Sequence, residues 1–320
     1  MKTKLIVISI LFATICFGQS KSLPFFAKNG NVALHTTQID ALADTLAVIN
    51  HRWDDVIWYR VVYKIIDLRE KQNNQLYFPI IPNEKYKSLF RTIMDATVDN
   101  SKPVPVYKKM DFNFQPLYDQ PFDRDSLPQC FLNCTWDTTL KTGVIPIMKG
   151  KLIKKNNILN NLEIDTTEWE DYAKKQMKFV VQEIVFFDRH YSRMYSKIIG
   201  IAPVFIYNQN NVDKMIRKDL NKEGESVWNF FINSVQCWYL YDELRPYLAK
   251  QFVIPNGNDG QAMTFDEYFA QKLYSSYILG DSNMFDRMLL QNYNDPTRIV
   301  KEQKRIETEL LNTELDLWEY

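Results

Sequence analysis

The chain has 320 residues, of which 46% are hydrophobic and 14% aromatic, so it can bury a large core in one domain or in two. Its 39 basic residues balance its 39 acidic residues, which argues against nucleic acid as a main partner because nucleic-acid-binding proteins usually carry a basic excess. Nine glycines and three histidines give little material for a phosphate-binding loop or a histidine-rich metal site, and we expect neither a cofactor nor a metal.

The N-terminal residues have the layout of a secretory signal peptide. Two lysines precede an apolar run over residues 5–12, and a small residue, Gly18, stands just before Gln19. The apolar run is much shorter than the roughly 20 residues that a membrane-spanning helix needs. We therefore expect a signal peptide over residues 1–18, cleaved near Gly18/Gln19, and a mature protein over residues 19–320 that reaches the periplasm and does not span the membrane.

Three cysteines remain after that cleavage: Cys130, Cys134 and Cys237. An odd number leaves at least one thiol outside any intramolecular disulfide, although an oxidising compartment permits one bridge. Cys130 and Cys134 lack a second cysteine pair or a histidine at zinc-ligand spacing, so zinc is not expected there. A local disulfide and two free thiols both remain open.

The first predicted element is a helix over residues 38–50. Ile39, Leu42, Leu46 and Ile49 recur at intervals of three and four residues, which is helical spacing. We expect His51 to lie at the end of this helix in a structural role.

Residues 56–66 are nearly all apolar or aromatic. Val56, Tyr59, Tyr63 and Ile66 keep helical spacing, whereas the β-branched content also suits a strand. We predict a helix here.

Another helix is predicted after Pro82, with Asn83 as its N-cap. One face of that helix is formed by Tyr86, Leu89, Phe90, Ile93 and Thr97. Residues 100–165 carry scattered prolines and asparagines, and we interpret them as a loop-rich crossover or as a boundary between two halves.

A capping box, Thr167-x-x-Glu170, predicts the start of a helix with Trp169, Ala173 and Met177 facing inward.

A β-hairpin is predicted next. Residues 179–187 and 191–207 are rich in β-branched and aromatic side chains, and residues 188–190 between them resemble a turn. Gly200 and Pro203 mark a bulge or an edge in the second strand.

A second capping box, Thr264-x-x-Glu267, is flanked by Met263 and Tyr268 at the positions of a hydrophobic staple. The last helix is predicted over residues 297–317.

The start of that last helix is indicated by Asp295 and Pro296, an N-cap residue followed by proline at the first helical position. Its apolar stripe consists of Ile299, Ile306, Leu310 and Leu317, and its expected ion pairs are Arg298/Glu302 and Arg305/Glu309. These elements together predict an α+β fold, with mixed helices, an antiparallel hairpin or sheet and a long C-terminal helix, in a single domain over residues 19–320.

The strongest candidate for chemistry is His190, because Asp188 could orient its imidazole. The same residues lie in a predicted turn, where aspartate is expected for local hydrogen bonding, and we favour that interpretation. Asp67, Arg69 and Glu70 could act as acid/base groups with a positioning arginine. We favour an ion-pair network there, since arginine fits a carboxylate and no nucleophile or metal ligand stands nearby in the sequence.

Several blocks of the sequence resemble the gliding-motility GldN family, also called PorN. The first block is Ile66-Asp67-Leu68-Arg69-Glu70-Lys71 with Asn73, Tyr77-Phe78-Pro79 and Ser88-Leu89-Phe90. The second is Lys197-Ile198-Ile199-Gly200-Ile201-Ala202-Pro203, and a weaker third block is Trp228 with Thr264-Phe265-Asp266-Glu267 and Phe269.

The resemblance implies a non-enzymatic, periplasmic part of the type IX protein secretion machinery. It implies a ring beneath the outer membrane, formed by self-association and with an outer-membrane lipoprotein of the GldK/PorK type, and contact with an inner-membrane rod protein of the GldM/PorM type. It provides no catalytic residues. The structural or interface candidates that it indicates are Asp67, Arg69, Glu70, Asn73, Tyr77, Pro79, Phe90, Gly200 and Pro203.

Two other functions remain open from the residues alone. One is a periplasmic hydrolase or lyase that uses His190 with Asp188 or Glu70. The other is a periplasmic module that binds a glycan or a peptide through exposed tryptophan and tyrosine side chains.

Overall fold

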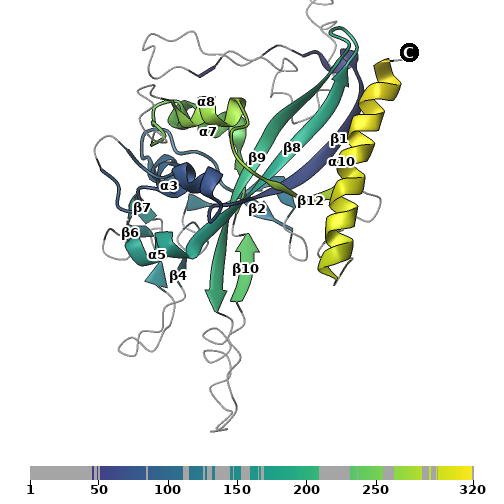
Figure 1. Ribbon diagram of the computed structural model, residues 1–320. Coiled ribbons are helices and arrows are strands. Elements are labelled where there is room, and N and C mark those ends of the chain that lie inside the picture. The colour runs from purple at the N-terminus through teal and green to yellow at the C-terminus, as the bar shows by residue number, and fades with distance from the viewer. Residues whose placement is uncertain are drawn as a thin grey trace, which may run out of the picture.

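The computed structural model describes residues 45–46, 49, 51–83, 86–110, 115–124, 127, 132–133, 145–146, 148–152, 159–164, 166, 169–208, 231–235, 237–254, 263–282, 288–289, 293 and 295–318. Helices and antiparallel strands form an α+β fold with a long helix at its C-terminal end, as predicted (Figure 1).

A six-stranded antiparallel sheet organises the fold. Its order is β10-β9-β8-β1-β12, with β11 pairing with β9 as well. The strands are β1 (Val56–Asp67), β8 (Gln176–Asp188), β9 (Arg193–Asn208), β10 (Phe231–Val235), β11 (Tyr239–Leu240) and β12 (Tyr277–Asp281).

Helices and three small strand pairs surround this sheet. The helices are η1 (Trp53–Asp55), η2 (Lys71–Asn73), α2 (Asn74–Tyr77), α3 (Leu89–Val98), α5 (Trp169–Lys175), α7 (Tyr241–Leu248), α8 (Phe265–Ala270) and α10 (Pro296–Trp318). The strand pairs are β2 (Tyr107–Lys109) with β3 (Pro116–Pro121), β4 (Leu132–Asn133) with β5 (Ile145–Pro146), and β6 (Met148–Leu152) with β7 (Leu159–Ile164). The segment predicted as loop-rich, 100–165, therefore contains short strand pairs where it is described.

The prediction of a helix over residues 56–66 is wrong, because this stretch is the strand β1. β1 pairs with β8 along most of its length and with β12 on its other side. Val62 and Ile66 belong to core clusters on one face of the sheet, and Val61 and Tyr63 to a cluster on the other. Since both faces are covered, apolar residues run continuously instead of alternating, and periodicity alone cannot separate such a strand from a helix.

The predicted hairpin is confirmed as β8 and β9, with a turn longer than expected because β9 begins at Arg193. Gln182 pairs with Gly200 and Glu183 with Ile198, which leaves one extra residue in β9 and forms the predicted bulge. Pro203 lies between the stretches of β9 that pair with β11 and with β10, a position that suits a residue without an N–H group.

Replacing Gly200 with Ala should lower the free energy of unfolding by about 1–3 kcal/mol, as overpacking usually does. A β-carbon there would collide with Tyr118 Oη and lie 3.2 Å from the carbonyl oxygen of Tyr239. Tyr118 is held in place because its hydroxyl donates to Gln182 Oε1 at 2.7 Å. Urea unfolding measures the effect. Adding Tyr118→Phe should recover part of the loss, and a double variant no more stable than Gly200→Ala would exclude the steric explanation.

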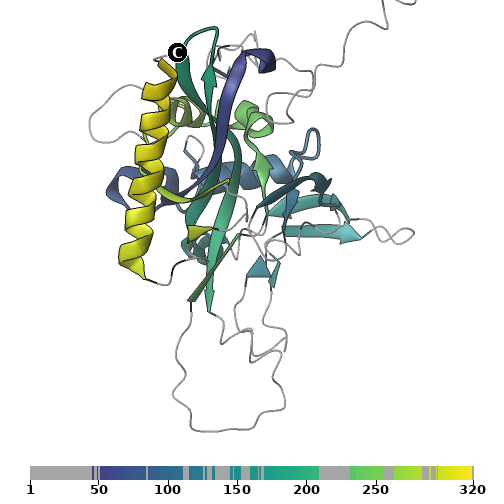
Figure 2. The same cartoon turned by 90° about the vertical axis from the view of Figure 1, so that its right-hand side faces the viewer.

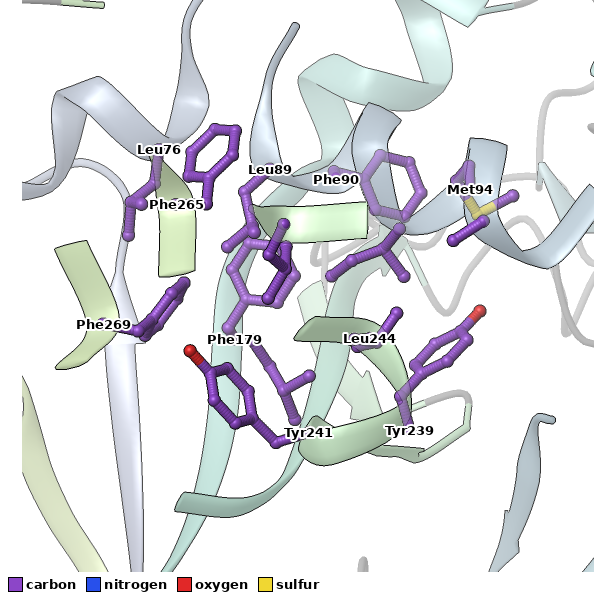
Figure 3. Packing of buried hydrophobic residues seen from close by; sticks show 14 of the residues in the cluster. Leu76, Leu89, Phe90, Met94, Phe179, Tyr239, Tyr241, Leu244, Phe265 and Phe269 are labelled. Atoms are coloured by element: carbon purple, nitrogen blue, oxygen red, sulfur yellow. The ribbon is translucent and has the colours of Figure 1, made fainter. Parts of the chain in front are cut away.

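The largest core cluster lies between one face of the sheet and helices α3, α7 and α8 (Figure 3). Phe179 of β8, Leu89 of α3, Leu244 of α7 and Phe265 of α8 are all fully buried in it. Each such side chain contributes roughly 1.5–3 kcal/mol on burial. Isolated helices shorter than about 12 residues are marginal in water, so this packing rather than propensity holds these short helices.

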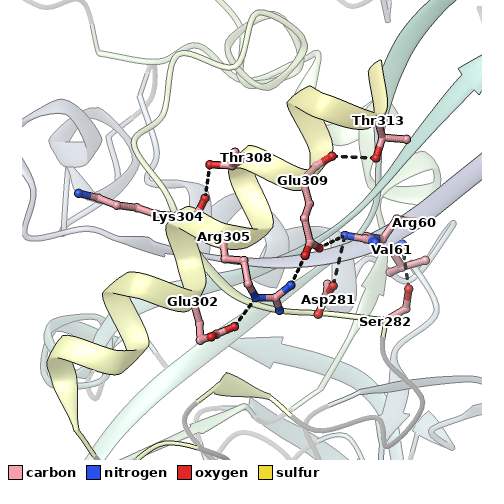
Figure 4. A network of polar contacts seen from close by, with 10 residues as sticks. All are labelled: Arg60, Val61, Asp281, Ser282, Glu302, Lys304, Arg305, Thr308, Glu309 and Thr313. Atoms are coloured by element: carbon pink, nitrogen blue, oxygen red, sulfur yellow. Dashed lines mark hydrogen bonds and ion pairs between the residues drawn. The ribbon is translucent and has the colours of Figure 1, made fainter. Parts of the chain in front are cut away.

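Helix α10 lies along the side of the sheet formed by β1 and β12 (Figures 1 and 2). Ile306 is fully buried against Val62 and Ile278, and Ile299 and Leu310 pack around them, as the predicted stripe requires. The predicted ion pair between Arg305 and Glu309 is present, whereas Glu302 pairs with Arg305 at 2.6 Å instead of with Arg298. Figure 4 shows this pair network continuing to Arg60 of β1.

Two predicted helix starts are confirmed. Thr264 and Glu267 form the full capping box of α8. Asp295 accepts hydrogen bonds from the N–H and hydroxyl groups of Thr297 at the start of α10. Thr167 lies outside the described residues, although Trp169 and Ala173 of α5 are buried as predicted.

Other boundaries were predicted wrongly. The helix expected after Asn83 begins at Leu89, with Ser88 as its N-cap, because the Ser88 hydroxyl accepts from the N–H group of Arg91. Leu89, Phe90, Ile93 and Thr97 are buried as predicted, whereas Tyr86 lies before the helix. Thr92, Met94 and Ala96 are buried as well. Met177 belongs to β8, since α5 ends at Lys175.

The helix predicted over residues 38–50 is wrong at residues 45, 46 and 49, which are described and are not helical. The rest of that range lies outside the described residues.

Candidate functional site

The first motif block begins at the end of β1, where Asp67 pairs with Arg69. Arg69 donates from Nε to Asp67 Oδ1 at 2.9 Å and from Nη2 to Oδ2 at 2.5 Å. This hydrogen-bonded pairing lowers the pKa of Asp67, against the opposing effect of partial burial. Glu70 instead lies next to Tyr277 of β12, and their hydrogen bond raises the pKa of that phenol. The block therefore combines a local ion pair, Asp67 with Arg69, and a contact from Glu70 to the distant strand β12.

Asn73 joins this connection to a segment distant in sequence. Its side chain is fully buried and donates to the carbonyl oxygens of Asp67 at 2.8 Å and Ser275 at 2.9 Å. Its Oδ1 accepts the N–H group of Ser275 at 2.9 Å. The neighbouring Gln72 donates to the carbonyl oxygen of Leu273 at 2.8 Å, so the two segments are held together at several points.

The rest of the block leads into α3. Tyr77 is half-buried, and Pro79 follows it after the exposed Phe78. Phe90 is buried and stacks on Trp169, with ring centroids 5.4 Å apart. The indole N–H of Trp169 donates to the carbonyl oxygen of Ile80 at 2.7 Å, which fixes the Tyr77–Ile80 stretch against the helical layer.

Asp188 pairs with a histidine that the sequence did not indicate. The backbone N–H of His190 donates to Asp188 Oδ1 at 2.8 Å, so His190 belongs to the turn. The other carboxylate oxygen lies 2.5 Å from Nδ1 of His51, which is 4% exposed and packs on Phe186 and Tyr195. His51 is thus tied to the hairpin rather than to a helix end. Its partner is 137 residues away, and no local signal predicts the contact.

The hydrolase or lyase hypothesis combines His190 with Asp188 or with Glu70, and Glu70 does not lie near the other two. Asp188 pairs with Val56 at the start of β1, whereas Glu70 follows the end of that strand. A strand of 12 residues separates them by roughly 40 Å. No common cleft therefore contains His190, Asp188 and Glu70.

A charged cluster surrounds Glu183, which is fully buried in β8. Lys64 of β1 donates to Glu183 Oε2 at 2.7 Å, and the Tyr274 hydroxyl donates to Oε1 at 2.6 Å. Lys272 Nζ lies 3.8 Å from the same carboxylate and also contacts the Ser196 hydroxyl. Sequence reasoning missed Glu183 and Lys64, although opposite charges near the middle of two largely apolar strands could have indicated that they pair.

The pKa values in this cluster follow from burial and from charge. Burial alone would raise the pKa of Glu183, but the charges of Lys64 and Lys272 and two hydrogen bonds outweigh it and hold the pKa below its usual 4.5. Burial lowers the pKa of Lys272. Burial and the neighbouring Glu183 raise the pKa of Tyr274 well above its usual value.

Glu183→Gln should therefore cost stability in a pH-dependent way. A carboxyl group whose pKa is lowered on folding stabilises the protein above its unfolded-state pKa and loses that effect as pH falls through the folded-state pKa. At pH 7 we expect the variant to be about 1–3 kcal/mol less stable. Towards pH 3 this difference should shrink, as measured by urea unfolding at several pH values. Glu170→Gln, in an exposed pair with Lys174, is the control, and a difference independent of pH would contradict the assignment.

A pocket of about 270 Å³ opens beside this cluster, between the start of β9 and helices α7 and α8. Its lining residues are Leu46, Ile49, Ser196, Lys197, Ile198, Tyr241, Asp242, Arg245, Asp266, Phe269, Ala270 and Lys272.

One wall of the pocket is a buried ion pair. Arg245 donates from Nε and Nη2 to the two oxygens of Asp266, at 2.8 Å and 3.0 Å. The same pair holds Leu46, whose N–H group donates to Asp266 Oδ2 at 2.9 Å and whose carbonyl oxygen accepts from Arg245 at 2.6 Å. Burial and the Asp266 charge raise the pKa of Tyr241, which lies in the same wall. The pocket thus combines apolar and charged side chains from segments far apart in sequence.

Three further observations bear on function. Within the described ranges, no three His, Cys, Asp or Glu side chains stand close enough to hold a metal ion. None of the helices in the described part of the chain combines the length and apolar character needed to cross a bilayer. Cys237 is buried, whereas Cys130 and Cys134 lie outside the described residues.

Comparison with known proteins gives one family. The family model for the gliding motility associated protein GldN matches residues 51–319, which covers nearly all of the described fold. A search of curated proteins found no match.

Proposed function

Because the chain belongs to the GldN family of gliding motility associated proteins, we propose that it is a non-enzymatic structural subunit of the type IX secretion and gliding machinery. The family match over residues 51–319 is the observation that carries this proposal. Two observations support it: Glu70 lies far from His190, and the Asp188 carboxylate contacts the backbone N–H of His190 and the side chain of His51.

In this role the chain lies in the periplasm and is associated with the inner face of the outer membrane through a partner. The chain forms a ring by self-association and with an outer-membrane lipoprotein of the GldK/PorK type. It contacts an inner-membrane rod protein of the GldM/PorM type. The layout of residues 1–18 as a signal peptide supports the location, and the family resemblance supports the partners.

Helix α10 is the docking element for the lipoprotein in this proposal. Its inner side is fastened by Ile306 and by Arg60, which donates to Glu309 at 3.2 Å (Figure 4). Its outer side exposes Val300, Leu311 and Leu315, with Leu311 62% and Leu315 66% exposed. Exposed leucines on a firmly attached helix can be covered by a partner without disturbing the fold.

The first test is the size of the native complex. Cross-linking of cell envelopes, followed by detection of this chain and mass spectrometry, should find it in very large assemblies that contain a lipoprotein. Recovery of the chain only as a monomer or small oligomer without that lipoprotein would contradict the proposal.

A variant with Leu311→Ser and Leu315→Ser should reduce incorporation into these assemblies. Because both side chains are exposed, we expect the free energy of unfolding to change by no more than about 0.5 kcal/mol. Asp316→Ser, at an exposed position on another side of the same helix, is the control and should assemble normally. Normal assembly of the double leucine variant would exclude α10 as the docking element.

A further inference from the structure

The lining of the pocket beside Glu183 contains one more positively charged side chain than negatively charged side chains. Its lining contains Lys197, Arg245 and Lys272 against Asp242 and Asp266, which is three positive charges against two negative ones. Arg245 pairs with Asp266, and Lys197 pairs with Asp242 at 2.8 Å. Lys272 is the remaining charge.

Lys272 forms an ion pair with Glu183, and the charge of Glu183 is already balanced by Lys64. Lys64 forms a 2.7 Å contact with Glu183, whereas Lys272 is 3.8 Å away. Three charges therefore share this position, two positive and one negative. A further anion at Lys272 would balance them, and it would be held in a partly desolvated place where a charged hydrogen bond is strong.

The backbone at Lys272 gives an independent indication. Lys272 follows α8 with φ of 52°, in the left-handed conformation that glycine usually supplies at the end of a helix. A residue with a β-carbon costs roughly 1–2 kcal/mol in this conformation. The lysine side chain is therefore placed at the rim of the pocket at an energetic cost.

The size and walls of the pocket narrow the ligand class. Sites for whole small molecules usually measure about 300–1,000 Å³, and this pocket, at about 270 Å³, is smaller. Phe269 and Ile198 form a buried apolar wall, and Leu46 and Ile49 expose apolar side chains at 37% and 47%. Such a site fits one or two side chains of a peptide.

We propose that this pocket binds an extended peptide segment of a partner protein through a carboxylate group and a neighbouring apolar side chain. The carboxylate contacts the Lys272 ammonium group, and the apolar side chain packs between Leu46 and Phe269. The carboxylate belongs either to an Asp or Glu side chain or to a chain terminus. This inference rests on the proposed function, in which the chain acts by binding other proteins.

The test is a titration of the purified chain with two pairs of short peptides, in which NMR chemical shifts of the chain report binding. One pair is acetyl-Leu-Glu-amide and acetyl-Leu-Gln-amide, and the other is acetyl-Gly-Leu with a free carboxyl group and its amide. In at least one pair the acid should bind about tenfold or more tightly than its neutral counterpart, because a hydrogen bond to a charged group is strong. The pair that binds identifies the source of the carboxylate.

Variants locate the site. Lys272→Met should abolish the preference for the acid, Lys272→Arg should retain most of it, and Lys301→Met on the exposed side of α10 should leave it unchanged. Since Lys272→Met also disturbs Glu183, Ala270→Trp offers a second route, because Ala270 is exposed and lines the pocket away from that carboxylate. Ala270→Trp should block binding while the protein remains folded by circular dichroism.

Equal binding of acid and neutral peptides, no binding of either acid, or unchanged binding in both Lys272→Met and Ala270→Trp would overturn the proposal. These results leave the proposed function intact, because cross-linking of envelopes measures assembly separately. Conversely, if cross-linking of envelopes recovers the chain only as a monomer, the structural role is excluded even where the peptides bind.

Discussion

Replacing Arg245 with Met should lower the free energy of unfolding by about 3–5 kcal/mol, the usual effect of leaving a buried charge without its partner. Asp266 is 1% exposed and depends on Arg245 for its counter-charge. The variant also removes the donor to the carbonyl oxygen of Leu46, so the N-terminal segment should be released as well. Urea unfolding measures the first effect, and limited proteolysis near residue 46 measures the second.

The double variant Arg245→Met with Asp266→Asn tests the electrostatic cause. The amide is neutral and keeps an oxygen for the N–H group of Leu46, so at least half of the lost stability should return. Lys174→Met, which breaks an exposed pair with Glu170, is the control and should cost less than about 1 kcal/mol. If the losses from Arg245→Met and Asp266→Asn simply add, the two groups are not coupled and the explanation fails.

Replacing Asn73 with Ala should cost about 3 kcal/mol or more. The change leaves the N–H and carbonyl groups of Ser275 and the carbonyl oxygen of Asp67 without a buried partner, at about 1–3 kcal/mol for each unsatisfied group, part of which relaxation recovers. Hydrogen exchange should show the amide of Ser275 losing its protection.

The neighbouring Gln72 is the matched control for this change. It is exposed, and its side chain donates to the carbonyl oxygen of Leu273, so Gln72→Ala should cost less than about 1 kcal/mol. Similar losses of stability in the two variants would mean that the Asn73 hydrogen bonds do not hold the β1–α2 connection to the segment at Ser275. Asn73 would then have a role other than stabilising the fold.

Elements with a local signal were predictable from the sequence. The capping box at Thr264 and the N-cap at Asp295 operate within three residues, so each is readable without any tertiary contact. The hairpin was also predictable, because its strands are adjacent in sequence and Gly200 marks the bulge. The start of α3 was predicted at Asn83 because Asn83 and Ser88 are equally good N-cap residues in local sequence. The packing of Leu89 and Phe90 in the core favours the later start, at Ser88.

The candidate site could not be predicted in the same way. Glu183 meets Lys64 across 119 residues and Tyr274 across 91, and Arg245 meets Leu46 across 199. Each of these residues alone resembles an ordinary surface charge or part of a strand. What gives them a role is burial, which makes an unpaired charge costly and forces the chain to bring a partner from elsewhere.

The sequence by itself determined the α+β class, the hairpin with its bulge and two of the helix starts, since these depend on hydrogen bonds and steric limits between near neighbours. The tertiary structure alone decided that residues 56–67 form a strand, that His51 rather than His190 pairs side chain to side chain with Asp188, and that Lys272 stands at a pocket with a surplus charge. The physical reason is that pairing of strands and burial of charge are settled by whichever distant segments the fold places in contact.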